Sequence, residues 1–363
     1  MAEFRFRTQE RNGELRYRDD MNSGPLRVLE IYGDPADFGR IHGAECKPMI
    51  RDYLDDRLGL SGDATWAGRS THADTVLSLA QATLPHHLDY SPDLYEEMTA
   101  LAEAAGITAA EAVVVGGFTD VVDVVRAHDG WAPIEDDCTA LLDPTNGVLA
   151  QTWDMHASAG EYVLMLKLEP VSGPTAVVQT TAGCLGQIGM NEAGIGVGIN
   201  NLTSIGKPGV TWPFVVRKVL QQTALDSAID AVTSADLAGG HNYLVMGPDG
   251  SGANIEAMPG TTRVTPVTDA PFVHTNHCLD EGTRLEEGER TPEHVAGSAI
   301  RLERGSELAS DLDGFFADTS IARRASSLEE VATCGAVVIR PGEKRLDSVW
   351  GIPGDNPWES FRL

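Results

Sequence analysis

The chain has 363 residues, with 27 Lys and Arg against 54 Asp and Glu, which gives a formal net charge of −27. A surface this acidic repels phosphate backbones and anionic lipids, so it argues against binding to nucleic acid and against attachment to a membrane. The hydrophobic share of 42% is high enough for a packed core, which excludes a wholly disordered chain.

The five cysteines, at positions 46, 138, 184, 278 and 334, form no CxxC pair and no regular spacing. This pattern indicates neither a disulfide framework nor a zinc site. The first twenty residues lack the apolar run of a secretory signal, and no stretch approaches the ~20 apolar residues of a membrane span. We therefore expect a cytoplasmic protein with reduced thiols and no membrane partner.

The N-terminal third is predicted to be mainly helical after one strand. Residues 26–33 alternate as a strand does, and Asp34 or Asp37 is suited to cap the helix that follows. Residues 72–126 contain three segments with capping residues and apolar residues at helical spacing, and Gly106 is suited to end the second of them.

From residue 138 onward the pattern predicts hairpins and helices. The Asn-Gly pair in residues 144–147 stands between two apolar runs, which is typical of a hairpin turn. This order of elements predicts an α+β fold with antiparallel sheets covered by helices. The other predicted elements are strands over 161–170 and 175–183, a hairpin around 191–194, one long helix over 212–234, strands around the turn 248–250, a helix over 291–310 and strands over 331–351.

Cys138 lies where an acidic, loop-like segment passes into the first of these hairpins. A single cysteine usually behaves as a small buried hydrophobe, so the residues around it in the sequence must indicate whether it takes part in a reaction. The segments QTWD (151–154), GMNEAGIGVGIN (189–200) and HNYL (241–244) follow it in order. Together with Cys138 they resemble the N-terminal-nucleophile (Ntn) cysteine hydrolases of the isopenicillin-N acyltransferase, or penicillin acyltransferase, family, which is related to choloylglycine hydrolase and acid-ceramidase-like enzymes.

Three further segments extend the resemblance over most of the chain. GDPADFGRIHG (33–43) is similar to the start of the family's helical prosegment, HTNH (274–277) to a family loop, and SAIRL (298–302) to its Ser/Arg helix. The resemblance implies a four-layer αββα sandwich with an N-terminal helical prosegment, 1–137, and a catalytic part, 138–363, in one compact unit. It implies no cofactor and no metal.

The resemblance also implies that the precursor cuts its own chain between Asp137 and Cys138, which would make an αβ heterodimer from one precursor. The Cys138 thiol attacks the preceding carbonyl, and water resolves the resulting thioester. The freed α-amine has a reference pKa near ~8, close to the ~8.5 of a thiol, so it can serve as the base without a separate histidine. A homo-oligomer of this unit remains open.

Four further residues receive roles by resemblance. Asp154 would accept from the Cys138 α-amine, although it could instead bond a turn. Asn242 and Asn200, the latter preferred over Asn201, would donate to the oxyanion, a role whose loss typically costs ~2.7–4 kcal/mol. Arg301 would support the site electrostatically, unless it pairs with Glu303 or Glu307 on its own helix.

The other motifs do not indicate a further functional site. His241, His274 and His277 lack the HxxxH or HExxH spacing of a metal site. GIGVGIN follows a hairpin turn and precedes no suitable helix, so it is not a dinucleotide loop. Cys46, Cys184, Cys278 and Cys334 lie in apolar or strand-like stretches and are expected in the core.

The residue before the nucleophile departs from the family pattern. Relatives often have Gly there, whereas Glu135, Asp136 and Asp137 precede Cys138 in this chain. Three carboxylates disfavour a thiolate, so we expect slow processing, or assistance by an Asp carboxylate in the proton transfers.

Three functions follow from these observations. The first is a self-processing enzyme that hydrolyses or transfers acyl groups of a small-molecule amide or an acyl-CoA-type thioester through an acyl-Cys138 intermediate. The second is a lipid-amide or bile-acid-type amidohydrolase on the same fold. The third is an unprocessed, non-catalytic descendant that binds a ligand. Pocket walls are expected from the prosegment helices and from Phe118, Tyr162, Trp212 and Phe214.

Overall fold

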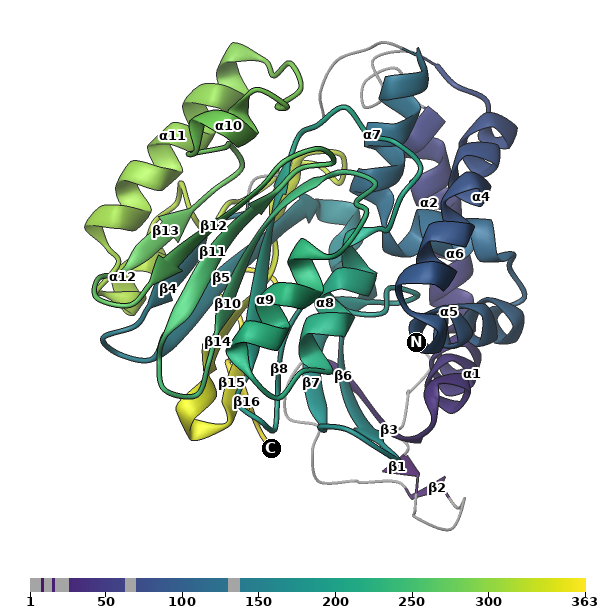
Figure 1. Cartoon of the computed structure of the whole chain (residues 1–363), viewed down its shortest axis with the longest axis horizontal. Helices are drawn as coiled ribbons and strands as arrows, with labels where there is room; N and C mark the ends of the chain where they lie inside the picture. Colours follow the sequence, from purple (N-terminus) through teal and green to yellow (C-terminus); the bar gives the residue numbers. More distant parts are fainter. Residues whose placement is uncertain (1–7, 10–14, 17–25, 63–69, 130–137) are drawn as a thin grey trace.

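Two β-sheets stacked face to face form the centre of the molecule (Figure 1). The computed structural model describes residues 8–9, 15–16, 26–62, 70–129 and 138–363. In spatial order the larger sheet consists of β12 (Thr262–Val267), β11 (Gly252–Ala257), β10 (Gly240–Met246), β9 (Gly196–Leu202), β8 (Ile188–Asn191), β7 (Ala176–Thr181), β6 (Val163–Pro170), β3 (Arg27–Gly33), β1 (Thr8–Gln9) and β2 (Leu15–Arg16). The smaller sheet consists of β13 (Phe272–His274), β4 (Ala140–Asp143), β5 (Val148–His156), β14 (Val331–Arg340), β15 (Arg345–Trp350) and β16 (Glu359–Arg362).

Helices cover both outer faces of this pair of sheets. On one side α8 and α9 pack on β8 to β11, and on the other α11 and α12 share a buried cluster with β4 and β5 (Figure 1). The four layers confirm the predicted αββα sandwich. The helices are α1 (Pro35–Glu45), α2 (Lys47–Gly62), α4 (Ala73–Tyr90), α5 (Pro92–Ala105), α6 (Ala109–Gly116), α7 (Phe118–Asp129), α8 (Trp212–Leu220), α9 (Leu225–Thr233), α10 (Glu281–Arg284), α11 (Pro292–Glu307) and α12 (Leu312–Ala317), with short 3₁₀ turns η1 (Ala157–Tyr162) and η2 (Pro341–Glu343).

Several N-terminal helices begin or end where the sequence predicts, but the third segment predicted within 72–126 is divided at Gly117 into α6 and α7. Asp34 caps α1 in a reciprocal capping box with Asp37, and Thr108 does the same for α6 with Glu111. Gly106 ends α5 in the left-handed conformation, with φ of 74°. At these three helix ends a side chain or a glycine satisfies unpaired backbone groups.

The N-terminal segment is built into the larger sheet rather than laid on it. Strand β3 runs parallel to β6, with Arg27 opposite Leu164 and Gly33 opposite Pro170. Helix α1 crosses α5 so closely that a β-carbon at Gly39 would lie 1.9 Å from the Glu97 carbonyl oxygen. The same buried hydrophobic cluster continues across both parts. The division at residue 137 stays a prediction.

The hairpins of the C-terminal part confirm their predicted turns, whereas one predicted helix is wrong. The β4–β5 turn is held by Asp143, whose Oδ1 accepts from the backbone of Thr145 at 3.0 Å, and Gly147 adopts φ of 60°. The single helix predicted over 212–234 is instead the pair α8 and α9. The break follows Leu220, because Asn191 Nδ2 binds the Leu220 carbonyl at 2.9 Å and ends the helix there.

The strands β12, β13 and β16 were not predicted from the pattern. β12 lies at an edge of the larger sheet with most of its side chains exposed, so it has little hydrophobic alternation. β13 is short, and β16 lies at the opposite edge of the smaller sheet.

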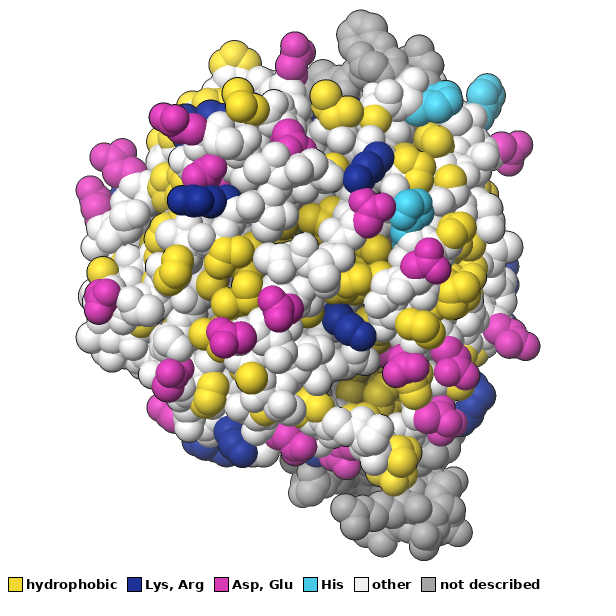
Figure 2. All heavy atoms as spheres, in the orientation of Figure 1, with side chains coloured by type: hydrophobic (Ala, Val, Ile, Leu, Met, Phe, Trp, Pro, Cys, Tyr) yellow, Lys and Arg dark blue, Asp and Glu magenta, His cyan; other side chains and the backbone are white. Residues whose placement is uncertain are grey.

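Among the described residues, no single helix is both long and apolar enough to cross a membrane. The helices Pro92–Ala105 and Ala109–Gly116, bent by 104° at their junction, meet the length and composition criteria only as a pair. On the visible surface, acidic side chains are scattered among fewer Lys and Arg side chains (Figure 2).

A buried ion pair joins α5, one of the N-terminal helices, to α8 on the larger sheet. Arg217 of α8 donates from Nη2 to Glu97 Oε2 of α5 at 2.8 Å, and both residues are buried. Burial raises the pKa of Glu97 to about 7, although the charge of Arg217 opposes this rise. A buried carboxyl can therefore take up a proton if its partner is lost, whereas a guanidinium cannot release one.

We expect Glu97→Gln to destabilise the chain by about 3–5 kcal/mol, because it leaves a buried guanidinium unpaired. Arg217→Met should cost less, and its cost should shrink below pH 7, where Glu97 becomes protonated. Urea unfolding at pH 5 and pH 8 measures both variants. The control is Asp355→Asn, which breaks an exposed pair with Arg324 and should leave stability almost unchanged, because solvent screens the pair. If Glu97→Gln and Arg217→Met lost the same stability at both pH values, the expected difference between an unpaired carboxyl and an unpaired guanidinium would be contradicted.

Candidate active site

Cys138 lies immediately before β4, and the β4–β5 hairpin brings Asp154 beside it. The backbone N–H of Asp154 points at the Cys138 sulfur at 3.5 Å, and the Asp154 carbonyl oxygen lies 3.8 Å from the same sulfur. The side chain of Cys138 is buried. In the uncut chain the sulfur is therefore held between the first two strands of the smaller sheet.

The main-chain carbonyl of Cys138 is held by two side chains from other layers. Asn200 of β9 donates from Nδ2 at 3.2 Å, and Arg301 of α11 donates from Nη1 at 2.7 Å. Both donors are buried, one of them carries a charge, and such hydrogen bonds are strong when water is excluded. This arrangement can stabilise negative charge beside the nucleophile.

Asn242 supports Asn200 rather than touching Cys138. The two residues face each other across the β9–β10 pair, and Asn242 Nδ2 donates to Asn200 Oδ1 at 3.4 Å. The hydrogen bond fixes which end of the Asn200 amide points at the Cys138 carbonyl. Asn201, the alternative weighed from the sequence, instead accepts a hydrogen bond at its backbone carbonyl from Asn276 at 3.1 Å.

Arg301 binds the nucleophile residue, and Glu307 on the same helix has a different partner. Besides the Cys138 carbonyl, it donates to Thr139 Oγ1 at 3.2 Å and to Asn276 Oδ1 at 3.1 Å. Glu307, one of the alternative partners predicted from the sequence, pairs with Arg304. The guanidinium therefore spans the site from the Cys138 carbonyl to the loop that follows β13.

The carboxyl group of Asp154 is fully buried between two threonines. Thr333 Oγ1 donates to Oδ1 at 2.6 Å, and Thr152 Oγ1 donates to Oδ2 at 3.4 Å. Burial raises the pKa of Asp154 to about 7, and the bond from Thr333 and the charge of Arg301 oppose this rise. The carboxyl can thus gain or release a proton near neutral pH.

Several supporting residues were not predicted from the sequence. Asn276 lies inside the HTNH segment, where the resemblance had already drawn attention, and its backbone N–H binds Ser298 Oγ at 3.0 Å. Thr152 adjoins the Trp-Asp pair. Thr333 has no sequence signal, because it meets Asp154 only through the register of β14 against β5.

A buried glutamate holds the loop that carries Asn276. Glu256 accepts from His274 Nε2 at 3.0 Å, from the backbone of Leu279 at 2.6 Å and from the Thr283 hydroxyl. Burial alone would raise the pKa of Glu256, but the hydrogen bond and charge of His274 outweigh it and lower the pKa to about 2. Glu256 is therefore ionised and anchors the loop over the site.

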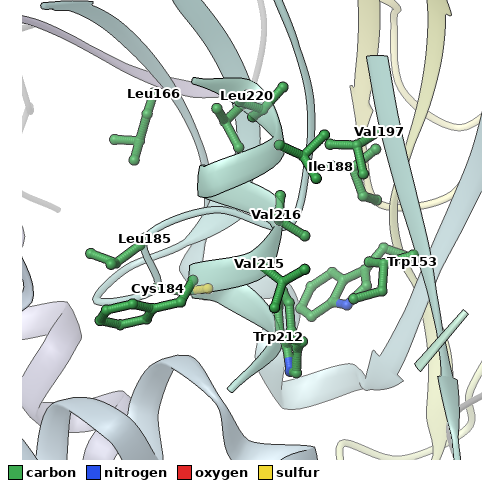
Figure 3. Packing of buried hydrophobic residues seen from close by; sticks show 14 of the residues in the cluster. Trp153, Leu166, Cys184, Leu185, Ile188, Val197, Trp212, Val215, Val216 and Leu220 are labelled. Atoms are coloured by element: carbon green, nitrogen blue, oxygen red, sulfur yellow. The ribbon is translucent and has the colours of Figure 1, made fainter. Parts of the chain in front are cut away.

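A cavity of about 40 Å³ adjoins Cys138, and it is lined by aromatic, aliphatic and polar residues. Phe118 and Trp212 line it, as predicted, together with Trp153, and Figure 3 shows the two tryptophans near Val215 of α8. Tyr162 and Phe214, also predicted as walls, are not among its lining residues. Tyr162 stacks on Tyr53 behind the wall, and Phe214 packs against His87. Two larger cavities, of about 300 and 450 Å³, contain none of the predicted site residues.

The three histidines weighed as metal ligands bind different partners. His274 binds Glu256, His277 binds Ser298 Oγ at 2.8 Å, and His241 lies 3.3 Å from Thr119 Oγ1. Across the described residues, no three His, Cys, Asp or Glu side chains are grouped as a metal site requires.

The four other cysteines are buried and form no disulfide among the described residues, which confirms their place in the core. Burial raises the pKa of Cys46 to about 12 and that of Cys184 to about 11. The same cause raises the pKa of Cys278. Thiols with such pKa values are poor nucleophiles.

Known proteins are similar to this chain over most of its length. The chain is 27% identical over 289 residues to "Acyl-coenzyme A:6-aminopenicillanic-acid-acyltransferase 40 kDa form" from Emericella nidulans, which covers 78% of this chain and 77% of the relative. Among solved structures, conjugated bile acid hydrolase from Clostridium perfringens overlaps with a TM-score of 0.44 and 10% identity, over 62% of this chain and 92% of that one. Penicillin V acylase from Agrobacterium tumefaciens overlaps with a TM-score of 0.36 and 11% identity, over 62% and 86%.

The sequence profile of the acyl-coenzyme A:6-aminopenicillanic acid acyl-transferase family matches residues 142–325. The match begins just after Cys138 and includes Asp154, Asn200, Asn242 and Arg301. It spans half of the chain. This protein therefore belongs to the acyl-coenzyme A:6-aminopenicillanic acid acyl-transferase family.

Proposed function

We propose that the protein cuts itself before Cys138 and then carries acyl groups on the Cys138 sulfur, taking them from a small-molecule amide or thioester. The observation that carries this proposal is the pair of donors, Asn200 and Arg301, on the Cys138 carbonyl. Asp137, the other residue of the bond to be cut, lies outside the described residues.

Self-cleavage needs only groups that the chain supplies, together with one water molecule. The Cys138 sulfur attacks the carbonyl carbon of Asp137, the acyl group shifts from nitrogen to sulfur, and water hydrolyses the thioester. The products would be residues 1–137 and 138–363, held together as a heterodimer. The new α-amine of Cys138, with a pKa near ~8, then lies next to its own sulfur and can act as the base.

The other side chains are proposed to work on the tetrahedral intermediates. Asn200 donates to the oxyanion, with Asn242 orienting its amide group, and Arg301 adds positive charge. Asp154 accepts a hydrogen bond from the freed α-amine. The contact of its backbone N–H with the Cys138 sulfur at 3.5 Å supports this role.

The family favours transfer of an acyl group over simple hydrolysis. Both the family and the curated relative are named for acyl-coenzyme A as donor and an amine, 6-aminopenicillanic acid, as acceptor. We therefore propose an acyl thioester as donor for this chain and an amine as acceptor, with water competing. A cavity of about 40 Å³ has room for water but not for such substrates, so its walls must separate before they bind.

The test of self-cleavage is the intact mass of the purified protein. Wild type should yield two chains that divide before Cys138, whereas Cys138→Ala should stay whole because it lacks the attacking sulfur. Cys278→Ala is the matched control, since it removes another buried thiol and should still be cut. A wild-type chain that stays whole, and whose Cys138 is not acylated by an acyl-CoA thioester, would sink the proposal.

The two asparagines should differ in their effect on catalysis. Asn200→Ala removes the donor itself and should lower kcat by about 10²–10³-fold. Asn242→Ala removes only the group that orients it, so the loss should be smaller. Steady-state hydrolysis of an acyl-CoA thioester measures both, with Asn254→Ala as a control at a buried asparagine in the neighbouring strand β11. A larger loss at Asn242 than at Asn200 would reverse the assignment.

Asp154 should make stability depend on pH. The folded chain holds the Asp154 proton up to about pH 7, whereas an unfolded Asp releases it near ~3.9, so raising the pH through this window favours unfolding. The contribution is up to about 4 kcal/mol. Urea unfolding of Cys138→Ala should show this loss between pH 4 and pH 7, and Cys138→Ala with Asp154→Asn should lack it. Parallel pH curves for the two would show that Asp154 is ionised throughout.

A further inference from the structure

The pairing of β14 with β5 changes register beside Asp154, and the proposed function gives this irregularity no role. Beyond the change the pairing is regular, with Gly335 opposite Trp153, whereas Thr333 lies opposite Asp154. Cys334 is therefore the extra residue of a β-bulge. If the regular pairing continued, Cys334 rather than Thr333 would lie opposite Asp154. Bulges next to active sites often re-aim a side chain, and this one brings a hydroxyl to a buried carboxyl.

The hydroxyl of Thr333 is oriented by a second backbone segment. The Thr333 N–H donates to the Arg323 carbonyl at 3.0 Å, and the Arg323 N–H donates to Thr333 Oγ1 at 2.9 Å. A threonine hydroxyl has one proton to donate and two lone pairs. Because the Arg323 N–H takes one lone pair, the hydroxyl proton can point at Asp154 Oδ1, which lies 2.6 Å away. Thr333 therefore acts as a donor to this carboxyl.

The bond from Thr333 is the stronger of the two hydroxyl bonds on Asp154. Its length of 2.6 Å is typical of an O–H group that donates to an ionised oxygen. Thr152 Oγ1 lies 3.4 Å from Oδ2, which is longer than the usual O–H···O bond. Burial raises the pKa of Asp154, and the bond from Thr333 opposes this rise more than the charge of Arg301 or the bond from Thr152 does.

The charged and titratable groups around Asp154 come from several parts of the fold. Arg301 of α11 acts on the carboxyl through its charge, and the Cys138 sulfur lies 3.5 Å from the Asp154 backbone nitrogen. Cys334 occupies the bulge in β14, and His156 lies two residues further along β5. Burial lowers the pKa of His156 to about 3, so this ring is neutral near pH 7. Without the hydroxyl from β14, the charge of Arg301 would be the main influence that opposes burial.

We propose that Thr333 is a positioning residue for the reaction, whose hydroxyl keeps the Asp154 carboxylate ionised and fixed in place to accept from the freed α-amine of Cys138. The proposal rests on the proposed function, which gives Asp154 that role. Thr333 does not line the cavity beside Cys138, so it acts through Asp154. The bulge in β14 is then part of the active site, because it decides which side chain meets the carboxylate.

The first experiment titrates the Asp154 carboxyl in the full-length, uncut variant Cys138→Ala. Carbon-13 NMR follows the side-chain carboxyl carbon, which is identified by its loss in Asp154→Asn. Thr333→Val removes the hydroxyl at constant size, so it should raise the midpoint by about 1–2 pH units, the effect of one hydrogen bond to a charged group. Thr333→Ser, the matched control, keeps the hydroxyl and should stay within about 0.5 units. Thr152→Val should raise the midpoint less than Thr333→Val, because its bond is longer.

The second experiment measures the acylation of Cys138 by hexanoyl-coenzyme A in the self-cleaved enzyme. Intact mass gives both the cut fraction and the acylated fraction, so rates are taken per cut chain. At a pH below the midpoint, each unit of upward shift lowers the ionised fraction about tenfold. Thr333→Val should therefore acylate about 10–100-fold more slowly at pH 6, with a smaller deficit at pH 9, and Thr333→Ser should stay within about threefold. A merely structural role would slow the reaction equally at both pH values.

The outcomes separate this proposal from the one on which it rests. A wild type whose Cys138 is never acylated overturns the proposed function, and the role of Thr333 with it. Normal acylation of wild type, with an unchanged midpoint in Thr333→Val or equal shifts in Thr333→Val and Thr333→Ser, overturns the role of Thr333 alone. A larger shift in Thr152→Val than in Thr333→Val, or a rate deficit that does not depend on pH, also overturns it. If Thr333→Val does not fold, Thr333→Ala removes the same hydroxyl without adding a methyl group beside the carboxylate, and its titration decides the question.

Discussion

The Cys138 carbonyl accepts hydrogen bonds from side chains in two layers of the molecule that are not adjacent. Asn200 belongs to the larger sheet, whereas Arg301 belongs to the helix on the outer face of the smaller sheet. Both donors reach the same oxygen only when sheet lies on sheet and α11 lies on the smaller sheet. The site is therefore a product of the whole stack, and no hairpin or helix could hold it alone.

Holding this site costs stability, and the costs are concentrated around it. Asp154 is fully buried, its pKa is raised, and two hydroxyls only partly replace its lost hydration. Buried polar atoms of Asn201, Asn242 and His241 lie nearby without a hydrogen-bond partner among the described residues. Natural proteins accept such groups where function requires them, and the large apolar core that continues from the N-terminal helices into both sheets offsets the penalty.

The sequence predicted what depends on neighbours along the chain and missed what depends on neighbours in space. The cap at Asp34, the turn before Gly147 and the Asn-containing strands β9 and β10 carry local signals, so they could be read from residue types and spacing. Thr333 could not be found, because it meets Asp154 through strand register alone.

The same limit explains two other differences. Thr119 and His241 stand more than a hundred positions apart, and a threonine in a helix has no pattern that marks it. The break between α8 and α9 depends on Asn191, a turn residue from another hairpin that binds the Leu220 carbonyl at the end of α8 and the Gln222 carbonyl just after it. In both places a tertiary contact decides the structure where local preference leaves it open.

The parallel pairing of β3 with β6 has a consequence for a chain cut before Cys138. The two pieces would share one sheet and one core, so they would stay together after the cut. Once such a pair unfolds, however, its halves must find each other again by diffusion, and refolding becomes a second-order process that slows on dilution. Cleavage would thus turn a reversible fold into one whose lifetime is set by its rate of unfolding.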